Sequence, residues 1–127
     1  MKSELEEELF AIEPSWFERS SPSKSNMYFG FDTGDGWFKL LKDLLLVLKK
    51  LGAENFEIVQ VKTKFGGLRF YYVGGGREVE TVIDWAEQVS YFICEFCGEN
   101  AKWRSLRGWQ WTLCDKCWEK KKLEETP

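Results

Sequence analysis

Four cysteines near the carboxyl end are the residues whose type and spacing point most clearly to chemistry. They form two Cys-x-x-Cys pairs, Cys94 with Cys97 and Cys114 with Cys117, and sixteen residues separate the pairs. Pairs at this spacing are typical of zinc sites, because each short bend brings two sulfurs together. Four thiolates complete a tetrahedral shell at Zn–S distances of about 2.3 Å and leave no position for water or substrate. The sequence therefore predicts one structural Zn²⁺, in preference to disulfides or free core thiols.

Catalytic chemistry has little support elsewhere in the chain. Histidine is absent, which removes the commonest general base and the Ser-His and Cys-His nucleophile arrangements. Asp32 and Asp35 lie in a glycine-rich turn that lacks the ligands of a calcium loop, so we interpret Asp35 as a cap of the following helix. Three glycines, Gly74 to Gly76, precede a helix and could bind an anion, but no P-loop lysine follows and a plain loop is the alternative. We predict that the protein is not an enzyme.

Composition limits the class of partner. The 127 residues are 43% hydrophobic and 17% aromatic, and the formal net charge is −3 at pH 7. The aromatic excess is typical either of a compact core or of a contact surface. Net negative charge opposes a global attraction to nucleic acid. The acidic start of the chain does not resemble an export signal, and the longest aliphatic run, 44–48, is too short to span a bilayer. We therefore expect a cytoplasmic protein whose thiols stay reduced.

Hydrophobic periodicity and turn residues predict the elements that position the cysteines. We expect α-helices at 3–12, 37–51 and 78–92, and strands at 27–31, 56–63 and 68–73. The clearest apolar stripe belongs to the second helix and consists of Trp37, Leu40, Leu41, Leu44, Leu48 and Leu51. Gly52 is placed to end that helix in a left-handed conformation. The third helix leads directly into Cys94, which ties the cysteines to the rest of the fold.

A second hairpin is expected between the two cysteine pairs. Residues 102–106 and 109–113 flank Arg107-Gly108, which is a tight-turn pair, and helix formers follow Cys117. A knuckle, a hairpin and a knuckle that opens a helix together look like a treble-clef zinc finger. We therefore expect an α+β fold with helices packed on a small antiparallel β-hairpin or sheet. The expected parts are a body at 1–93 and a treble-clef-like zinc module at 94–127, continuous with that body.

Several stretches of the chain resemble a family of small proteins found widely in phages and prophages. The shared stretches are GDGWF at 34–38, VQVKTKFGGLRFY at 59–71, Ser90-Tyr91, and the two knuckles around Gly108-Trp109. The amino-terminal stretch at 5–17 looks similar too, so the resemblance covers nearly the whole chain. It implies zinc, one continuous fold and the cytoplasm of an infected or lysogenic bacterium. It also implies an accessory role, such as inhibiting a host enzyme or defence protein, but no established activity.

Two classes of partner remain open. The first is a host or phage protein, bound by aromatic and arginine side chains, which are typical interface anchors. The candidate partner-binding residues are Arg69, Tyr71, Trp103, Arg104, Arg107 and Trp109. The second class is nucleic acid bound by the cations of the zinc-finger hairpin, or a nucleotide held near Arg69 and the glycine loop. The cations and carboxylates after residue 93 nearly balance, which weakens this second alternative.

Overall fold

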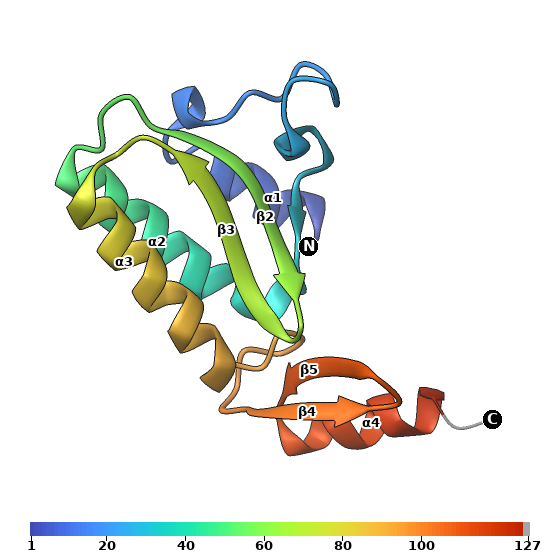
Figure 1. Cartoon of the computed structure of the whole chain (residues 1–127). Helices are drawn as coiled ribbons and strands as arrows, with labels where there is room; N and C mark the ends of the chain where they lie inside the picture. The colour runs from blue at the N-terminus through green and yellow to red at the C-terminus, as the bar shows by residue number, and fades with distance from the viewer. Residues whose placement is uncertain (126–127) are drawn as a thin grey trace.

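The expected α+β architecture is confirmed in the structure, a computed structural model that describes residues 1–125. Four α-helices and two small sheets make up this part of the chain (Figure 1). The helices are α1 (Ser3–Phe10), α2 (Phe38–Leu51), α3 (Arg77–Val89) and α4 (Asp115–Glu125). The strands are β1 (Phe31–Asp32), β2 (Glu57–Lys64), β3 (Gly67–Val73), β4 (Lys102–Leu106) and β5 (Trp109–Leu113). The last two residues of the predicted 94–127 module lie outside the described residues.

The body is built on a three-stranded sheet in the order β1-β2-β3. Strand β1 runs parallel to β2, and β2 pairs antiparallel with β3 through a two-residue turn at Phe65 and Gly66. One face of β2 and β3 is buried, including Ile58, Val61 and Phe70, and a β-bulge between residues 58 and 60 brings Ile58 and Val61 to that face. They face α2 and α3, which lie side by side along one side of the sheet (Figure 1). Both predicted strands of this hairpin are confirmed to within a residue or two.

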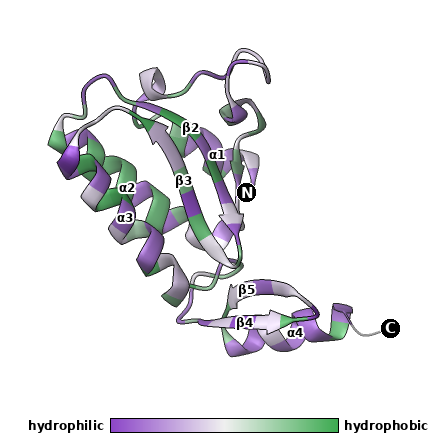
Figure 2. Ribbon diagram, in the orientation of Figure 1, coloured by the Kyte–Doolittle hydropathy of each residue, from purple (hydrophilic) through white to green (hydrophobic). Residues whose placement is uncertain are grey.

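Helix α2 supplies the largest share of the core because its apolar residues recur at helical spacing. Its buried side chains are Leu40, Leu41, Leu44, Leu45 and Leu48, and Figure 2 shows the green, hydrophobic residues gathered there. The predicted stripe missed Leu45 and wrongly included Leu51, which is exposed at the last turn. Gly52 ends the helix with φ +71° and ψ +44°, so the predicted left-handed stop is confirmed.

The strand predicted at 27–31 is wrong for most of its length. Residues Asn26–Phe29 form a 3₁₀ turn, because the hydroxyl of Ser25 accepts a hydrogen bond from the backbone N–H of Met27 and caps it. Gly30, at φ +79°, then redirects the chain into the short strand β1. Local capping chemistry therefore overrides the strand preference of this aromatic segment.

The role predicted for Asp35 is also wrong. Asp35 lies inside a 3₁₀ turn, Asp35–Trp37, and no side-chain hydrogen bond caps α2. Its Oδ1 instead accepts a hydrogen bond of 2.9 Å from the backbone N–H of Lys2, at the start of α1. The side chain thus links α1 to the turn before α2.

The third helix is shorter than predicted, whereas the helix opened by the second knuckle is confirmed. Helix α3 ends at Val89 and is followed by a 3₁₀ turn, Ser90–Phe92, which delivers the chain to Cys94. Helix α4 begins at Asp115, so the second Cys-x-x-Cys pair opens a helix, as predicted. Strands β4 and β5 and helix α4 form a group beside the end of the β2–β3 hairpin (Figure 1). Within residues 1–125, none of the helices combines the length and hydrophobicity that crossing a membrane requires.

Candidate metal centre

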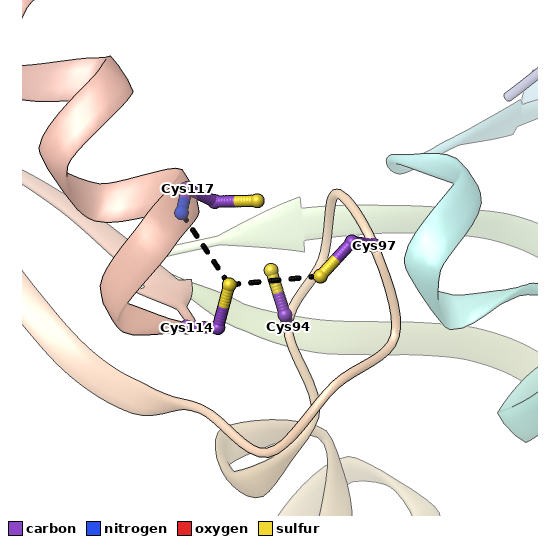
Figure 3. Close-up of side chains that lie close together, drawn as sticks. All are labelled: Cys94, Cys97, Cys114 and Cys117. Carbon is purple, nitrogen blue, oxygen red and sulfur yellow. Dashed lines mark hydrogen bonds between the residues drawn. The ribbon is translucent and has the colours of Figure 1, made fainter.

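The four cysteines that the spacing singled out lie in one cluster. Their sulfur atoms all lie within 4.8 Å of one another, and Cys97 Sγ is 3.6 Å from Cys114 Sγ (Figure 3). Four sulfurs around one ion at about 2.3 Å are separated by about 3.8 Å, as tetrahedral geometry requires. A disulfide needs sulfurs about 2.05 Å apart, and all four cysteines are free. The cluster therefore fits a metal ion better than a disulfide.

Two different local structures present the sulfurs. In the first pair, the N–H of Cys94 donates to the carbonyl of Glu99, and the N–H of Gly98 donates to the carbonyl of Cys94. Gly98 has φ +84°, so a residue without Cβ closes this knuckle. In the second pair, Cys114 immediately precedes α4 and Cys117 lies in the first turn of that helix. The N–H of Cys117 donates to Cys114 Sγ at 3.4 Å (Figure 3).

The electrostatic environments of the thiols differ. The backbone N–H of Cys117 lowers the pKa of Cys114 to about 7. The N–H of Glu99 acts to lower the pKa of Cys97, but burial and the neighbouring cysteines outweigh it and raise that pKa. Burial, followed by the adjacent thiols, raises the pKa of Cys117. Thiols this close oppose each other's ionisation, so a cation is needed for all four to be thiolates together.

The chemistry of this donor set limits the possible ions. Thiolates are soft ligands, and four of them in a tetrahedral arrangement suit Zn²⁺ or iron. Cys94 is fully buried and the other three are more accessible, so the cluster lies at the edge of the body. The structure thus supports a site that could hold a metal ion.

The first knuckle is fastened to the body through Glu95, a residue that the sequence analysis did not single out. Glu95 is almost completely buried. Its carboxylate accepts hydrogen bonds from the N–H of Gly34 and from the hydroxyl of Thr63. Its backbone carbonyl accepts a hydrogen bond of 2.7 Å from the N–H of Gly36. Nothing in the sequence marks this glutamate among the other 20 acidic residues, because its partners lie far away in the chain.

The glycines before α2 allow this contact. A Cβ on Gly36 would lie 2.1 Å from the carbonyl oxygen of Cys94, and one on Gly34 would lie 2.3 Å from that of Glu95. The neighbouring Trp37 is fully buried and donates from its indole Nε1 to the carbonyl of Ile93 at 2.8 Å. In addition to forming the turn before α2, these glycines allow two stretches of backbone to approach each other closely.

A second contact joins the β2–β3 turn to the hairpin β4–β5. The indole Nε1 of Trp103 donates to the carbonyl of Phe65 at 2.9 Å, and the hydroxyl of Thr112 donates to the carbonyl of Gly66 at 2.6 Å. Both polar side chains come from the hairpin between the cysteine pairs. A Cβ on Gly67 would lie 2.3 Å from the ring of Tyr91. The body therefore holds the cysteine-bearing segment at two places.

The six candidate partner-binding residues do not form one surface. Trp103 pairs with Thr112, whereas Trp109 pairs with Leu106. Because successive side chains of a strand point to opposite faces, the two indoles lie on opposite faces of the hairpin. Trp109 and Tyr71 are exposed. Arg69 donates to the hydroxyl of Tyr91 at 3.1 Å, which brings it toward the side of the hairpin that bears Trp103.

The two arginines of the hairpin β4–β5, Arg104 and Arg107, have partners within the chain. Arg104 is 2.6 Å from the Asp115 carboxylate and also donates to the carbonyl of Leu113. The hydrogen bond from Arg104 lowers the pKa of Asp115. Arg107, at φ +53° in the turn, donates to the carbonyl of Glu125. These contacts fasten the hairpin to α4, so neither guanidinium is wholly free for a phosphate.

The glycine loop before α3 is closely packed. The backbone N–H of Gly75 donates to the carbonyl of Glu54, and a Cβ on Gly74 would lie 1.6 Å from the carbonyl oxygen of Asn55. The first turn of α3 contains Glu78 and Glu80, whose charge opposes an anion at that helix start. Close contacts therefore explain Gly74 and Gly75, whereas Gly76 has nothing within 4 Å of its Cβ position and is explained by its φ of +86°.

The chain was compared with known protein families, curated proteins and solved structures, and no match was found in any of the three.

Proposed function

We propose that the four cysteines bind one Zn²⁺ and that this ion is structural. Support comes from the sulfur cluster, in which all four ligand atoms lie within 4.8 Å of one another. Four protein ligands leave zinc no open position, so the ion would order the chain rather than activate water. The order of knuckle, hairpin β4–β5, second knuckle and helix α4 supports a treble-clef-like module.

Metal analysis tests this proposal directly. Protein purified in a reductant that does not chelate metal should contain one zinc per chain by native mass spectrometry. Cobalt substitution should give the absorption of a tetrahedral four-thiolate site. Metal-free protein with the correct mass, or a cobalt spectrum with a water ligand, would refute the closed zinc site.

We further propose that the zinc-stabilised module serves recognition of another protein, without catalysis. Exposed aromatic side chains near the metal module, including Trp103 and Phe92, support this role, because such residues anchor interfaces. The resemblance to phage and prophage proteins supports an accessory role inside a bacterium, such as inhibition of a host protein. Among the described residues, the internal partners of Arg104 and Arg107 count against nucleic acid as the ligand of the hairpin.

Affinity purification from a bacterial lysate tests the recognition role. Nuclease-treated lysate passed over zinc-loaded protein should yield one stoichiometric protein partner. The matched control is protein whose zinc has been removed, since loss of the metal should release that partner. Recovery of nucleic acid alone from an untreated lysate would contradict the proposal.

A further inference from the structure

We propose that an aromatic depression beside the hairpin β4–β5 binds a segment of a partner protein. The bound segment is acidic and contains an apolar side chain. The depression, of about 720 Å³, is lined by Phe65, Tyr91, Phe92, Ala101, Lys102 and Trp103. We call this surface the aromatic depression. The inference rests on the proposed recognition function and specifies where and what the protein binds.

Three separate parts of the fold contribute the rings. Phe65 belongs to the β2–β3 turn, Phe92 to the 3₁₀ turn after α3, and Trp103 to β4. These rings are 64%, 69% and 51% exposed, respectively. The bond from Trp103 Nε1 to the Phe65 carbonyl fixes one wall of the depression. Because this bond holds the Trp103 indole in place, that ring loses little entropy on binding, which favours its use as an anchor.

Phe65 has an unfavourable backbone conformation, and its side chain is too exposed for burial to offset that cost. It has φ +53° and Gly66 has φ +82°, so both central residues of this two-residue turn lie in the left-handed region. Asparagine or aspartate followed by glycine is the common choice for such a turn, and a bulky residue at positive φ is an outlier. An exposed phenylalanine here does not stabilise the fold by packing, so contact with a ligand is the explanation that we infer.

Charge selects an acidic occupant. The residues that line the aromatic depression include the cation Lys102 and no acidic residue. Lys64 Nζ lies 5.6 Å from the centroid of the Phe65 ring. Arg69 reaches the rim through the Tyr91 hydroxyl. Within residues 1–125, none of these three cations lies within 4.0 Å of a carboxylate, although Lys102 acts electrostatically on Asp115. Carboxylates of a partner would complement them.

The groove between α2 and α3 does not offer the same selection. It is lined by apolar side chains that include Val47 and the exposed Trp85, together with Asp35 and Asp43. Both aspartates already lie near a lysine of the chain, Asp43 at 3.1 Å from Lys39 and Asp35 at 3.8 Å from Lys2. This groove therefore serves as the internal comparison for the aromatic depression.

Selection from a displayed library of random peptides, with the zinc-loaded full chain as bait, tests the occupant. Enriched peptides should have a net negative charge and at least one aromatic or large aliphatic residue. A synthetic, labelled copy of the best peptide should bind less tightly as salt rises, as expected when surface charges contribute. No enrichment, or enrichment of neutral or basic peptides, would refute the proposal, as would stronger binding of single-stranded oligo-dT than of the peptide.

Matched variants test the location. Phe65→Ala combined with Phe92→Ala should weaken the peptide by about tenfold or more, and Lys64→Glu with Lys102→Glu should weaken it and reduce its salt dependence. Two control variants change exposed positions elsewhere: the single variant Trp85→Ala and the double variant Lys24→Glu with Lys50→Glu. Each should change the affinity for the peptide less than twofold. All variants should keep the circular dichroism and zinc content of the parent. Weakening by Trp85→Ala alone would place binding in the α2–α3 groove and refute the location.

The two proposals can fail separately. If a stoichiometric protein partner is captured and the aromatic variants still bind it fully, the recognition function stands and the aromatic depression is not its site. If no protein partner is captured under any condition tested, the recognition function itself fails.

Discussion

At the scale of single residues, glycines decide how closely the cysteine-bearing segment can approach the body. The carbonyl oxygens of Cys94 and Glu95 occupy the space that a Cβ on Gly36 or Gly34 would need. The same close approach allows the N–H of Gly36 to donate to the Glu95 carbonyl. A methyl group at this point displaces backbone rather than a flexible side chain, so relief is costly.

Gly36→Ala should therefore destabilise the protein, near or above the upper end of the roughly 1–3 kcal/mol typical of overpacking. The measurement is the free energy of unfolding in urea. Gly52→Ala is the control, because Gly52 has positive φ but nothing within 4 Å of its Cβ position. That change should cost about 1–2 kcal/mol through backbone strain alone and should leave zinc content unaltered. Equal losses for the two variants would contradict close packing at Gly36.

Phe65 gives a second prediction at this scale, with opposite effects on stability and binding. Phe65→Asn places a residue that tolerates positive φ into the same turn, so the free energy of unfolding should rise by about 0.5–1 kcal/mol. Affinity for the selected peptide should fall, because the exposed ring is lost. Urea unfolding and fluorescence anisotropy measure the two effects. A variant that is less stable than the parent would show that the ring contributes packing after all.

At the scale of elements, the hairpin β4–β5 and helix α4 differ from the body in how they are stabilised. The main core cluster draws its fully packed members from residues between Leu9 and Ala86. None of the residues of α4 is buried, and Figure 2 shows this helix mostly in the purple of hydrophilic residues. A segment with so little apolar burial depends on other constraints, and a bound ion is the constraint that the cysteine cluster suggests.

Removal of the metal should therefore open this segment before the body. In protein treated with a strong zinc chelator, the amides of β5 and α4 should lose protection from hydrogen exchange by tenfold or more. Amides of α2 and β2 should keep theirs, because their core is separate from the sulfur cluster. Readdition of zinc is the control and should restore the protection. Simultaneous loss of protection in α2 would show that the body cannot fold without the metal.

At the scale of the whole molecule, the contacts of Glu95 with the body would couple the folded body to the affinity for the proposed ion. Glu95 binds Gly34 and Thr63 on one side and, through its backbone N–H, the carbonyl of Thr112 on the other. If these contacts form only in the metal-bound state, they must contribute to metal affinity, and the metal must stabilise the docked arrangement by the same amount. None of these groups is a sulfur ligand.

Glu95→Ala should weaken zinc binding although the four cysteines are intact. The change leaves the Gly34 N–H and the Thr63 hydroxyl without their acceptor, at a cost of about 1–3 kcal/mol, which corresponds to roughly 5- to 150-fold in affinity. Competition with a chromogenic chelator measures this loss. Glu99→Ala is the matched control, since the Glu99 side chain is exposed and lies in the same knuckle. Equal affinities for Glu95→Ala and the parent would contradict the coupling.

Local patterns in the sequence determined the features that depend on neighbours in the chain. The Cys-x-x-Cys spacing predicted which residues cluster, and the leucine periodicity predicted most of the α2 face. The turn between the strands at 56–63 and 68–73, and the turn at Arg107-Gly108, were predictable because strand runs flank them on both sides. In each case the relevant residues are close in sequence, so spacing alone carries the information. The strand predicted at 27–31 was wrong because the Ser25 hydroxyl caps a 3₁₀ turn at this place.

Tertiary structure alone decided what depends on residues far apart in the chain. The selection of Glu95 as the docking residue, the need for glycine at Gly36 and the separation of Trp103 from Trp109 follow from contacts across some 30 to 60 residues or from strand register. Exposure of the rings likewise depends on the whole fold, since burial is a property of all neighbours together. The sequence by itself therefore predicted a metal site, and only the folded chain showed which aromatic side chains beside that site are exposed.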